Sequence, residues 1–577
     1  MNRLYLLAIV GAFAPAMLGA QSPQTEPVAV LPTPAPATTL PLKLEPRPTT
    51  AAITPQDLMT RLYIFADDSM QGREAGTIGN VKATDYLAAE ARRLGLYPAG
   101  QGGTYFQTIP LMTRGLAPDS RFVIAGSPLT LGTDWAAIGT ESLTRTDIPI
   151  VFAGTLGESV IPAGEMMGRL VIFRVPAGPA GPISLRDAMT AAPGAAAVAL
   201  VGLDQYIGFL VQPNTFVDKP GEKPPAAPVM LVLSEKAAAK VFGNPLEMVS
   251  PGSNAGAATV DVRTRVEPVP YPARNVVAIL QGTDHKLHGQ YIAIGAHNDH
   301  VGFNNRPVDH DSLRIFNDIV RPGGAEDGAK QASPEQQALV NQRLAAWRQE
   351  NPGAARLDSI FNGADDDGSG SVALLEIAEA LSQAKSKDRL KRSILFVWHV
   401  GEEKGLLGSA YYTDNPTVPR DSIVAQLNMD MVGRGNSWDM TGTSKEGAPL
   451  YGNDDYLQLI GSRRLSKELG DIVEQVNVDG KFGFNFDYAM DANGHPANIY
   501  CRSDHYEYAR YGIPVTFFTT GVHSAYHQVT DEPQYIDYDR LARVSRLVQS
   551  IATRIANLDH RIALDGPKPD PNATCRQ

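Results

Sequence analysis

The chain has 577 residues, which is too long for one ordinary hydrophobic core, so we expect two domains with additional tails. Its composition, 43% hydrophobic and 20% charged, is typical of a globular protein. Asp and Glu outnumber Lys and Arg by 62 to 51, giving a formal net charge of −11, and no basic run suits the binding of phosphates. Nucleic acid is therefore not expected as a partner.

Residues 1–20 predict a secretory signal peptide. A short cationic start at Asn2 and Arg3 precedes a largely apolar stretch over residues 4–18, and small residues stand before Gln21. The apolar stretch is short for a membrane span, so we expect export, to the periplasm or by secretion, with no stable membrane span after cleavage. An uncleaved anchor is the alternative. Residues 21–54, rich in Pro, Thr and Ala, predict an extended linker.

The two cysteines of the chain, Cys501 and Cys575, allow two interpretations. In an oxidising compartment they could form a disulfide. However, Cys575 lies in a Pro-rich tail over residues 566–577, and nothing in the sequence fixes its position. A disulfide and two free thiols therefore both stay open.

From residue 274 onward, apolar runs of strand length alternate with helical patterns. The runs at residues 275–280, 291–296, 393–398, 423–427 and 514–518 predict strands. Leu374, Ile377, Ala378 and Leu381 keep helical spacing directly after three aspartates, so a helix should begin there. This alternation predicts an α/β fold with a mixed, largely parallel sheet flanked by helices.

Five short segments carry side chains that suit a metal site. They are His-Asn-Asp-His at 297–300, Ala-Asp-Asp-Asp-Gly-Ser-Gly at 364–370, Gly-Glu-Glu at 401–403, Asn-Met-Asp-Met at 428–431 and Tyr-His at 526–527. Imidazole nitrogens and carboxylate oxygens are ligands that suit Zn²⁺, and one Glu is left over to handle a proton. Several of these segments follow predicted strands, where the loops of an open α/β sheet leave a crevice. They can therefore meet in one place.

Each segment by itself has an ordinary explanation. A His at a strand end is more often a core or surface residue, three consecutive Asp residues usually mark a solvated turn or a Ca²⁺ loop, and a Glu-Glu pair is usually exposed. Asp430 is the strongest single signal, because an unpaired charge in an apolar run is costly. The combination of segments, more than any one of them, predicts the site.

In their order along the chain, these segments resemble the M28 family of zinc-dependent peptidases, in its bacterial aminopeptidase branch. Further matching motifs are Glu-Glu-x-Gly-Leu-Leu-Gly-Ser at 402–409, Asn-x-Asp-Met-Val-Gly at 428–433, Ser-Asp-His at 503–505 and Gly-Ile-Pro at 512–514. The resemblance implies a zinc-exopeptidase fold over residues 55–116 and 270–565. It also implies two zinc ions per chain, with ligands His297, Asp366, Glu403, Asp430 and His527.

The same resemblance implies how these residues divide the work. Asp366 would be shared by both metals, with His297 and Asp430 on one and the remaining two ligands on the other. Glu402 would be the general base, Asp299 would orient His297 as a carboxylate beside a ligating imidazole commonly does, and Tyr526 would donate to the oxyanion.

Two segments interrupt the peptidase pattern. Residues 117–269 carry no ligand motif, and apolar runs at 148–153, 170–175, 195–201 and 229–233 predict a smaller β-rich α/β domain that resembles the protease-associated domain. Residues 304–361 are a second insertion, between the first two ligands. Within it, Ser333 and Pro334 predict a helix start, and Val340, Leu344 and Trp347 an apolar stripe. A rim or lid, a surface excursion and a dimer contact all stay open, as does the oligomeric state.

The favoured hypothesis is an exported aminopeptidase that hydrolyses N-terminal residues from peptide substrates with a metal-bound water and Glu402 as base. A zinc carboxypeptidase or dipeptidase of the same family is an alternative. Such an enzyme would need cations to bind the free carboxylate of its substrate. Arg434, Arg502 and Arg510 lie near the motifs in sequence, as do Asp504 and Glu507. A catalytically inert binding protein is disfavoured, because every expected ligand and the base are present.

Overall fold

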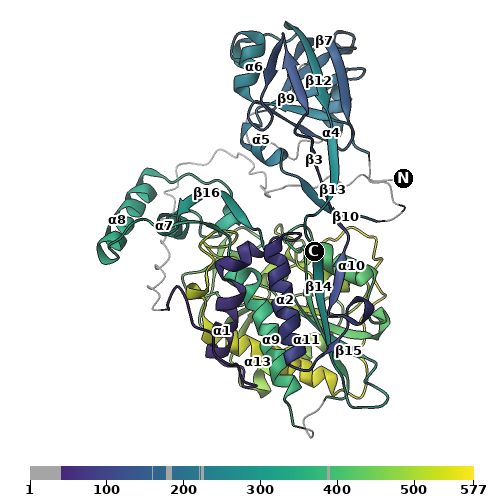
Figure 1. The fold of residues 1–577 in the computed structure, drawn as a ribbon, viewed down its shortest axis with the longest axis vertical. Coiled ribbons are helices and arrows are strands. Elements are labelled where there is room, and N and C mark those ends of the chain that lie inside the picture. Colours follow the sequence, from purple (N-terminus) through teal and green to yellow (C-terminus); the bar gives the residue numbers. More distant parts are fainter. Residues whose placement is uncertain (1–39, 159, 177–184, 220, 222–225, 386–389) are drawn as a thin grey trace. The chain divides into compact units, whose positions relative to one another are not determined.

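The computed structural model describes residues 40–158, 160–176, 185–219, 221, 226–385 and 390–577, in which the chain forms two compact units (Figure 1). One unit is Leu111–Pro268, and the other is formed by the chain on both sides of it, up to Pro110 and from Val269 to Gln577. The predicted signal peptide and most of the predicted linker lie outside the described residues. Among the helices that are described, none is long and apolar enough to cross a membrane.

The larger unit is built on a nine-stranded mixed sheet with the strand order β1, β14, β18, β15, β19, β24, β22, β23, and with β2 also paired to β14. The four central strands, β18 (Ser393–His399), β15 (Tyr291–His297), β19 (Ile423–Met429) and β24 (Val515–Thr519), are parallel to one another. The outer strands are β1 (Tyr97–Pro98), β2 (Phe106–Ile109), β14 (Ala273–Leu280), β22 (Tyr456–Ile460) and β23 (Asn485–Asp487). The predicted α/β class with a mixed sheet is confirmed.

Helices cover both faces of this sheet. Ile292 and Ile294 of β15 lie in one core and Ala293 in the other, because successive strand residues point to opposite faces. The first core contains α1 (Pro55–Phe65), α2 (Ile78–Arg93), α9 (Gly370–Ser382), α11 (Lys467–Asp479) and α13 (Tyr538–Ala556). The second contains α10 (Leu407–Asp414) and α12 (His505–Ala509). Burial on both faces explains why the central strands are continuous apolar runs in the sequence.

The smaller unit has an eight-stranded sheet in the order β5, β4, β12, β7, β8, β9, β11, β6, and a three-stranded sheet of β10, β3 and β13. The four predicted apolar runs form β7 (Leu143–Thr155), β8 (Leu170–Arg174), β9 (Ala197–Val201) and β11 (Met230–Leu233), which are parallel neighbours. The other elements include β3 (Leu111–Leu116), β4 (Arg121–Ile124), β5 (Ser127–Leu129), β6 (Trp135–Ile138), α5 (Asp204–Leu210), β10 (Asn214–Val217), α6 (Glu235–Phe242), β12 (Asn254–Val262) and β13 (Thr264–Pro268). Its identity as a protease-associated domain stays a prediction.

The second insertion is ordered around two helices. It contains β16 (Phe303–Asp309), α7 (His310–Val320), the 3₁₀ helix η4 (Gly324–Asp327), α8 (Pro334–Glu350) and β17 (Leu357–Ile360). Helix α8 begins where the sequence predicts, with Ser333 as N-cap in a capping box with Gln336. The buried Val340 and the flanking Trp347 pack against Ile315 and Ile319 of α7, so the apolar stripe covers α7.

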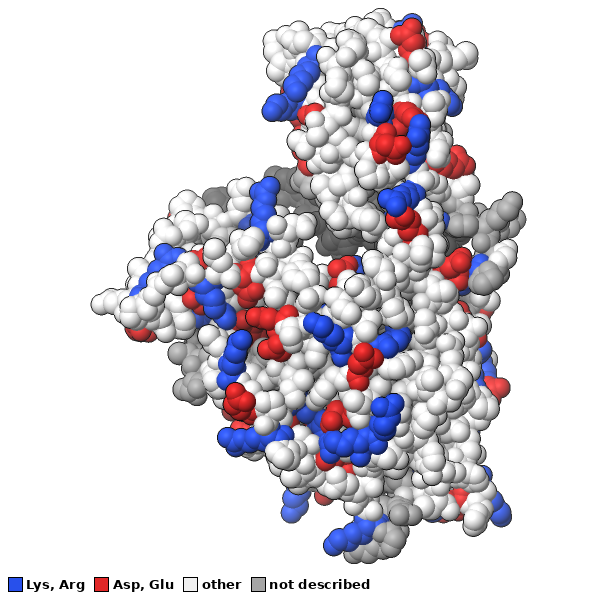
Figure 2. All heavy atoms as spheres, viewed as in Figure 1, with Lys and Arg blue, Asp and Glu red and all other residues white. Residues whose placement is uncertain are grey.

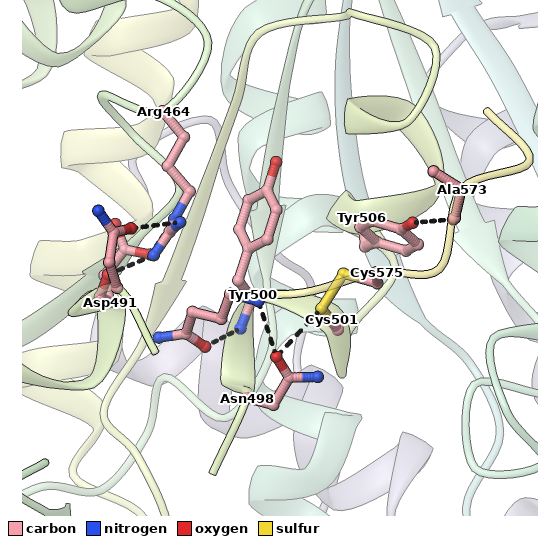
Figure 3. The surroundings of a disulfide bond; sticks show 10 residues. Arg464, Asp491, Asn498, Tyr500, Cys501, Tyr506, Ala573 and Cys575 are labelled. Atoms are coloured by element: carbon pink, nitrogen blue, oxygen red, sulfur yellow. Dashed lines mark hydrogen bonds and ion pairs between the residues drawn. A yellow bond between two sulfur atoms is a disulfide. The ribbon is translucent and has the colours of Figure 1, made fainter. Parts of the chain in front are cut away.

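Cys501 and Cys575 form a disulfide, which decides between the two interpretations of the cysteines (Figure 3). Their Cα atoms are 5.9 Å apart across 74 positions of sequence. Beside the bond, the backbone N–H of Gln577 donates to the Asn498 side chain at 3.0 Å, and the N–H of Tyr500 donates to the Gln577 side chain at 2.9 Å. The C-terminal tail is therefore fixed against the segment that contains Cys501.

A buried ion-pair network joins the helices of the first core. Arg61 of α1, only 1% exposed, pairs with Glu376 and Glu379 of α9 and with Glu90 of α2. Arg93, whose side chain is 45% exposed, pairs with Glu90 and Glu379 from the surface. Removal of Arg61 would leave buried carboxylates without their main partner.

We therefore expect Arg61→Leu to lower the free energy of unfolding of the larger unit by about 3–5 kcal/mol, since a buried charge loses its compensation. Arg93→Leu is the matched control, because it removes a cation from the same carboxylates at an exposed position and should cost about 1 kcal/mol or less. Calorimetric unfolding of both variants checks this. Equal effects would contradict a stabilising role for the buried pair.

Candidate active site

Four parallel strands bring the predicted ligands to one edge of the large sheet. His297 is the last residue of β15, and Asp430 directly follows β19. Glu403 lies in the loop after β18, and His527 lies in the loop after β24. The carboxyl ends of parallel strands meet at one edge, and Asp366 reaches the same place from the segment before α9.

Asp366 stands between two groups of possible ligand atoms. Its Oδ1 is 3.1 Å from Nε2 of His297, which is also 3.6 Å from Oδ1 of Asp430. Its Oδ2 is 3.0 Å from Nε2 of His527, which is also 2.8 Å from Oε2 of Glu403. The structure thus brings all five predicted ligands together and places Asp366 in both groups.

His300 joins the second group, although the sequence led us to no role for it. Its Nδ1 is 2.7 Å from Oε1 of Glu403 and 3.8 Å from Oδ2 of Asp366, and its ring meets that of His527 edge-on with centroids 5.5 Å apart. Its position three residues after His297, at the same strand end, was a usable signal. The second group therefore offers one more nitrogen than we predicted.

The residues present fit a divalent cation. Nε2 of His297, Nε2 of His527 and Oδ2 of Asp366 are buried and have no hydrogen-bond partner among the described residues. Buried polar atoms without partners are costly and rare in native proteins. Imidazole nitrogens and carboxylate oxygens that face one another at these distances are a donor set suited to zinc and similar metals.

The aspartates beside Asp366 hold the backbone rather than face the ligand groups. Oδ2 of Asp367 accepts from the backbone N–H of His297 at 3.0 Å. Asp531 accepts from the backbone N–H groups of Asp365 and Asp366, at 3.0 and 3.1 Å. The peptide bond between Asp366 and Asp367 is cis. Because the carboxylates of Asp365 and Asp367 accept from backbone N–H groups, Asp366 is the one of the three that faces both histidines.

Asp299 contacts two parts of the site. The Nδ1 of His297 is 3.1 Å from the main-chain oxygen of Asp299 and 3.8 Å from its carboxylate. The same carboxylate accepts from the backbone N–H of Glu402 at 3.2 Å. Asp299 therefore lies where it can position both the imidazole of His297 and the loop that carries Glu402.

Ser503 is a further site residue that sequence reasoning did not identify. Its hydroxyl donates to Oδ2 of Asp430 at 2.8 Å and accepts from the side chain of Asn428 at 3.0 Å. This chain of hydrogen bonds fixes the Asp430 carboxylate with Oδ1 toward His297. Ser503 belongs to the Ser-Asp-His motif. The motif therefore indicated this segment of the chain, but not the hydrogen bond between Ser503 and Asp430.

Burial and mutual repulsion shift the pKa values of the acidic groups. Burial raises the pKa of Glu402 well above its usual range, with Asp430 and Glu403 adding to the effect. Burial likewise raises the pKa of Asp299 to about 7. Although burial opposes it, the nearby imidazoles of His297 and His527 hold the pKa of Asp366 well below its usual range. The shared carboxylate is therefore ionised.

A cavity opens at these residues. Its lining includes the acidic side chains of Asp366, Glu402 and Asp430 and the ring of Tyr526, which stacks on His527 with centroids 4.1 Å apart. The remaining lining is largely apolar or neutral, with Met490, Ile499, Phe517, Gln458 and Thr441 among its residues. An apolar recess beside the ligand groups suits an uncharged side chain of a substrate.

Of the three arginines near the motifs, Arg502 lines the cavity. Arg434 is buried and pairs with Asp439 at 2.6 Å, and Arg510 pairs with Asp414 at 2.6 Å. On the face drawn in Figure 2, positive and negative side chains are interspersed, and its described residues form no continuous basic surface. Arg502 is therefore the arginine to consider in substrate binding.

The fold and the site define an α/β protein with two facing His/carboxylate groups that share one aspartate. Residues 346–552 match the sequence model of peptidase family M28. This span contains Asp366, Glu402, Glu403, Asp430 and His527, whereas His297 lies before it, on the far side of the second insertion. Over these residues the chain is therefore similar to peptidase family M28.

Named relatives match parts of the chain. It is 29% identical over 208 residues to leucine aminopeptidase 1 of Ajellomyces capsulatus, covering 34% of this chain and 48% of that one. It is 39% identical over 101 residues to an aminopeptidase of Pseudomonas aeruginosa, covering 16% of this chain and 18% of that one. The chain thus spans about half the length or less of these curated relatives. A solved zinc aminopeptidase from Bacillus subtilis is 17% identical, with 90% of this chain and 98% of that chain covered and a TM-score of 0.47.

Proposed function

We propose that this protein is an exported zinc aminopeptidase that binds two metal ions and hydrolyses N-terminal residues from peptides. One observation carries the proposal: two groups of facing ligands share Asp366, which lines a cavity together with Glu402 and Asp430. The names of the relatives support the choice of reaction and of peptide substrates. The whole-chain activity is proposed because those matches are partial.

Each metal has its own set of residues in this proposal. His297, Asp366 and Asp430 would hold one ion, and Asp366, Glu403 and His527 would hold the other, with His300 beside Glu403. When bound, zinc supplies Lewis acidity that polarises a carbonyl group and makes water more acidic. The cations would also compensate the carboxylates that burial otherwise destabilises.

The chain's own residues handle the proton and the developing charge. Glu402 would take a proton from the attacking water at its carboxylate and deliver it to the leaving amine, while Asp299 holds the backbone of Glu402 in place. The Tyr526 hydroxyl would donate to the oxyanion. Burial raises the pKa of Tyr526 above its ordinary value, so the hydroxyl keeps the proton that it must share.

The names of the relatives favour attack at the N-terminal end of the peptide. Arg502, the arginine that lines the cavity, is already paired with Glu326, so it is not free to bind a C-terminal carboxylate. A dipeptidase or carboxypeptidase is the second candidate, because Arg502 is a cation at the cavity. Export is supported by the Cys501–Cys575 disulfide, since such bonds persist in oxidising compartments.

Glu402→Gln should lower kcat on peptides with a free N-terminus by about 10²–10⁴-fold, because the amide cannot accept the proton. A panel of N-blocked, C-blocked and free peptides tests the end attacked: an aminopeptidase hydrolyses the C-blocked and free members alone. Gln has nearly the same shape as Glu, so circular dichroism should be unchanged. Near-normal turnover in this variant would refute the role of Glu402, and hydrolysis of the N-blocked members would favour the second candidate.

Asp366→Ala should remove both zinc ions, because its carboxylate lies in both groups of ligands, whereas His297→Ala and His527→Ala should each affect mainly one. Elemental analysis after dialysis gives the stoichiometry. Asp539→Ala is the control, since it removes an exposed carboxylate at the start of α13. Retention of two ions by Asp366→Ala would show that a different residue bridges them.

A further inference from the structure

The second insertion packs directly onto the loop that carries Tyr526. The backbone N–H of Ala325, in η4, donates to the main-chain oxygen of Tyr526 at 3.0 Å. Gly324 has a positive φ of 59°, and a Cβ atom there would lie 2.6 Å from the Tyr526 oxygen and 2.7 Å from the His523 oxygen. Only glycine allows this approach. The insertion is therefore in close backbone contact with the site.

Helix α7 of the insertion contacts the same loop through side chains. The Ser524 hydroxyl donates to Asp318 at 2.6 Å, and the buried Asn317 donates to the side chain of Gln528 at 3.4 Å. These contacts lie on both sides of Tyr526 and His527 in the sequence. They favour a rim at the site over a plain surface excursion, and a deletion of the insertion would leave this loop without its support.

One charged contact links the insertion to the cavity itself. Glu326 of η4 forms an ion pair with Arg502, whose side chain lines the cavity together with Glu402 and Tyr526. The side chains of Arg502 and Glu326 are 37% and 38% exposed, so the pair lies in contact with water. Arg502 thus presents a guanidinium to the cavity, and Glu326 is already paired with this guanidinium.

We propose that Glu326 is a specificity-determining residue that engages Arg502 and thereby disfavours substrates with a carboxylate close to the cleaved bond. The proposal rests on the proposed peptidase function. A free guanidinium binds a carboxylate through two parallel hydrogen bonds. With Glu326 in that position, a substrate carboxylate must displace it and meets its negative charge. Longer peptides and peptide amides carry no charge there and are unaffected.

The dipeptide leucyl-glycine and its C-terminal amide test this directly, because they differ only in the carboxylate. In Glu326→Gln, the ratio of kcat/KM for the dipeptide to that for its amide should rise about tenfold, the gain expected from one charge-assisted contact. Zinc content should match that of the wild type, since Glu326 lies in neither ligand group. Glu350→Gln, at the exposed end of α8, is the matched control and should leave the ratio unchanged.

A double-mutant cycle shows whether Glu326 acts through Arg502. In an Arg502→Gln background, Glu326→Gln should no longer change the ratio, because the cation that it occupies is gone. A ratio that stays at the wild-type value in Glu326→Gln would overturn the inference, as would an equal loss of activity on both peptides. If the wild type hydrolyses no member of the peptide panel, the proposed function fails and this inference fails with it. Wild-type hydrolysis with an unchanged ratio refutes the inference alone.

Discussion

The concentration of buried charge at one edge of the large sheet is the constraint on which the site depends. Asp366, Glu402, Glu403 and Asp430 all line or adjoin a single cavity, and carboxylates packed this closely repel one another and are costly to bury. Histidines compensate part of this charge, and the buried ligand atoms without hydrogen-bond partners indicate that cations complete the compensation. Such an arrangement needs rigid support, and the four parallel strands, buried on both faces, provide it.

Sequence patterns predicted the parts of this support that depend on local order. Buried parallel strands are continuous apolar runs, so their ends, and hence the places of His297 and Asp430, could be predicted without a structure. The start of α8 could also be predicted, because an N-cap Ser followed by Pro is a local signal for a helix N-terminus. His300 and Ser503 were missed as site residues because their roles come from contacts with Glu403 and Asp430, which lie 103 and 73 positions away. Residue type and spacing do not encode such distant contacts.

The cysteines and the second insertion show the same limit. Nothing near Cys575 indicates that the C-terminal tail returns to Cys501, because the pairing depends on how the chain folds between two cysteines that are 74 positions apart. Likewise, the apolar stripe of α8 predicted that this helix packs against another part of the chain but not which part. The structure identifies that partner as α7. The more informative residue was Gly324, whose positive φ and close approach to Tyr526 cannot be distinguished in sequence from an ordinary turn glycine.

Ligands and cavity wall are held by different kinds of structure. His297 and Asp430 lie at strand ends, and Glu403 and His527 lie in the loops that follow two other strands of the sheet. Asp366 lies in a segment whose backbone N–H groups donate to the Asp531 carboxylate. The wall around Arg502 is instead assembled from loops: the disulfide at Cys501 anchors it to the tail, and Glu326 approaches it from the insertion. Loops on a rigid scaffold tolerate change better than the scaffold does. Substitutions in this wall can therefore alter which peptides bind while the ligand groups, and the chemistry that depends on them, stay intact.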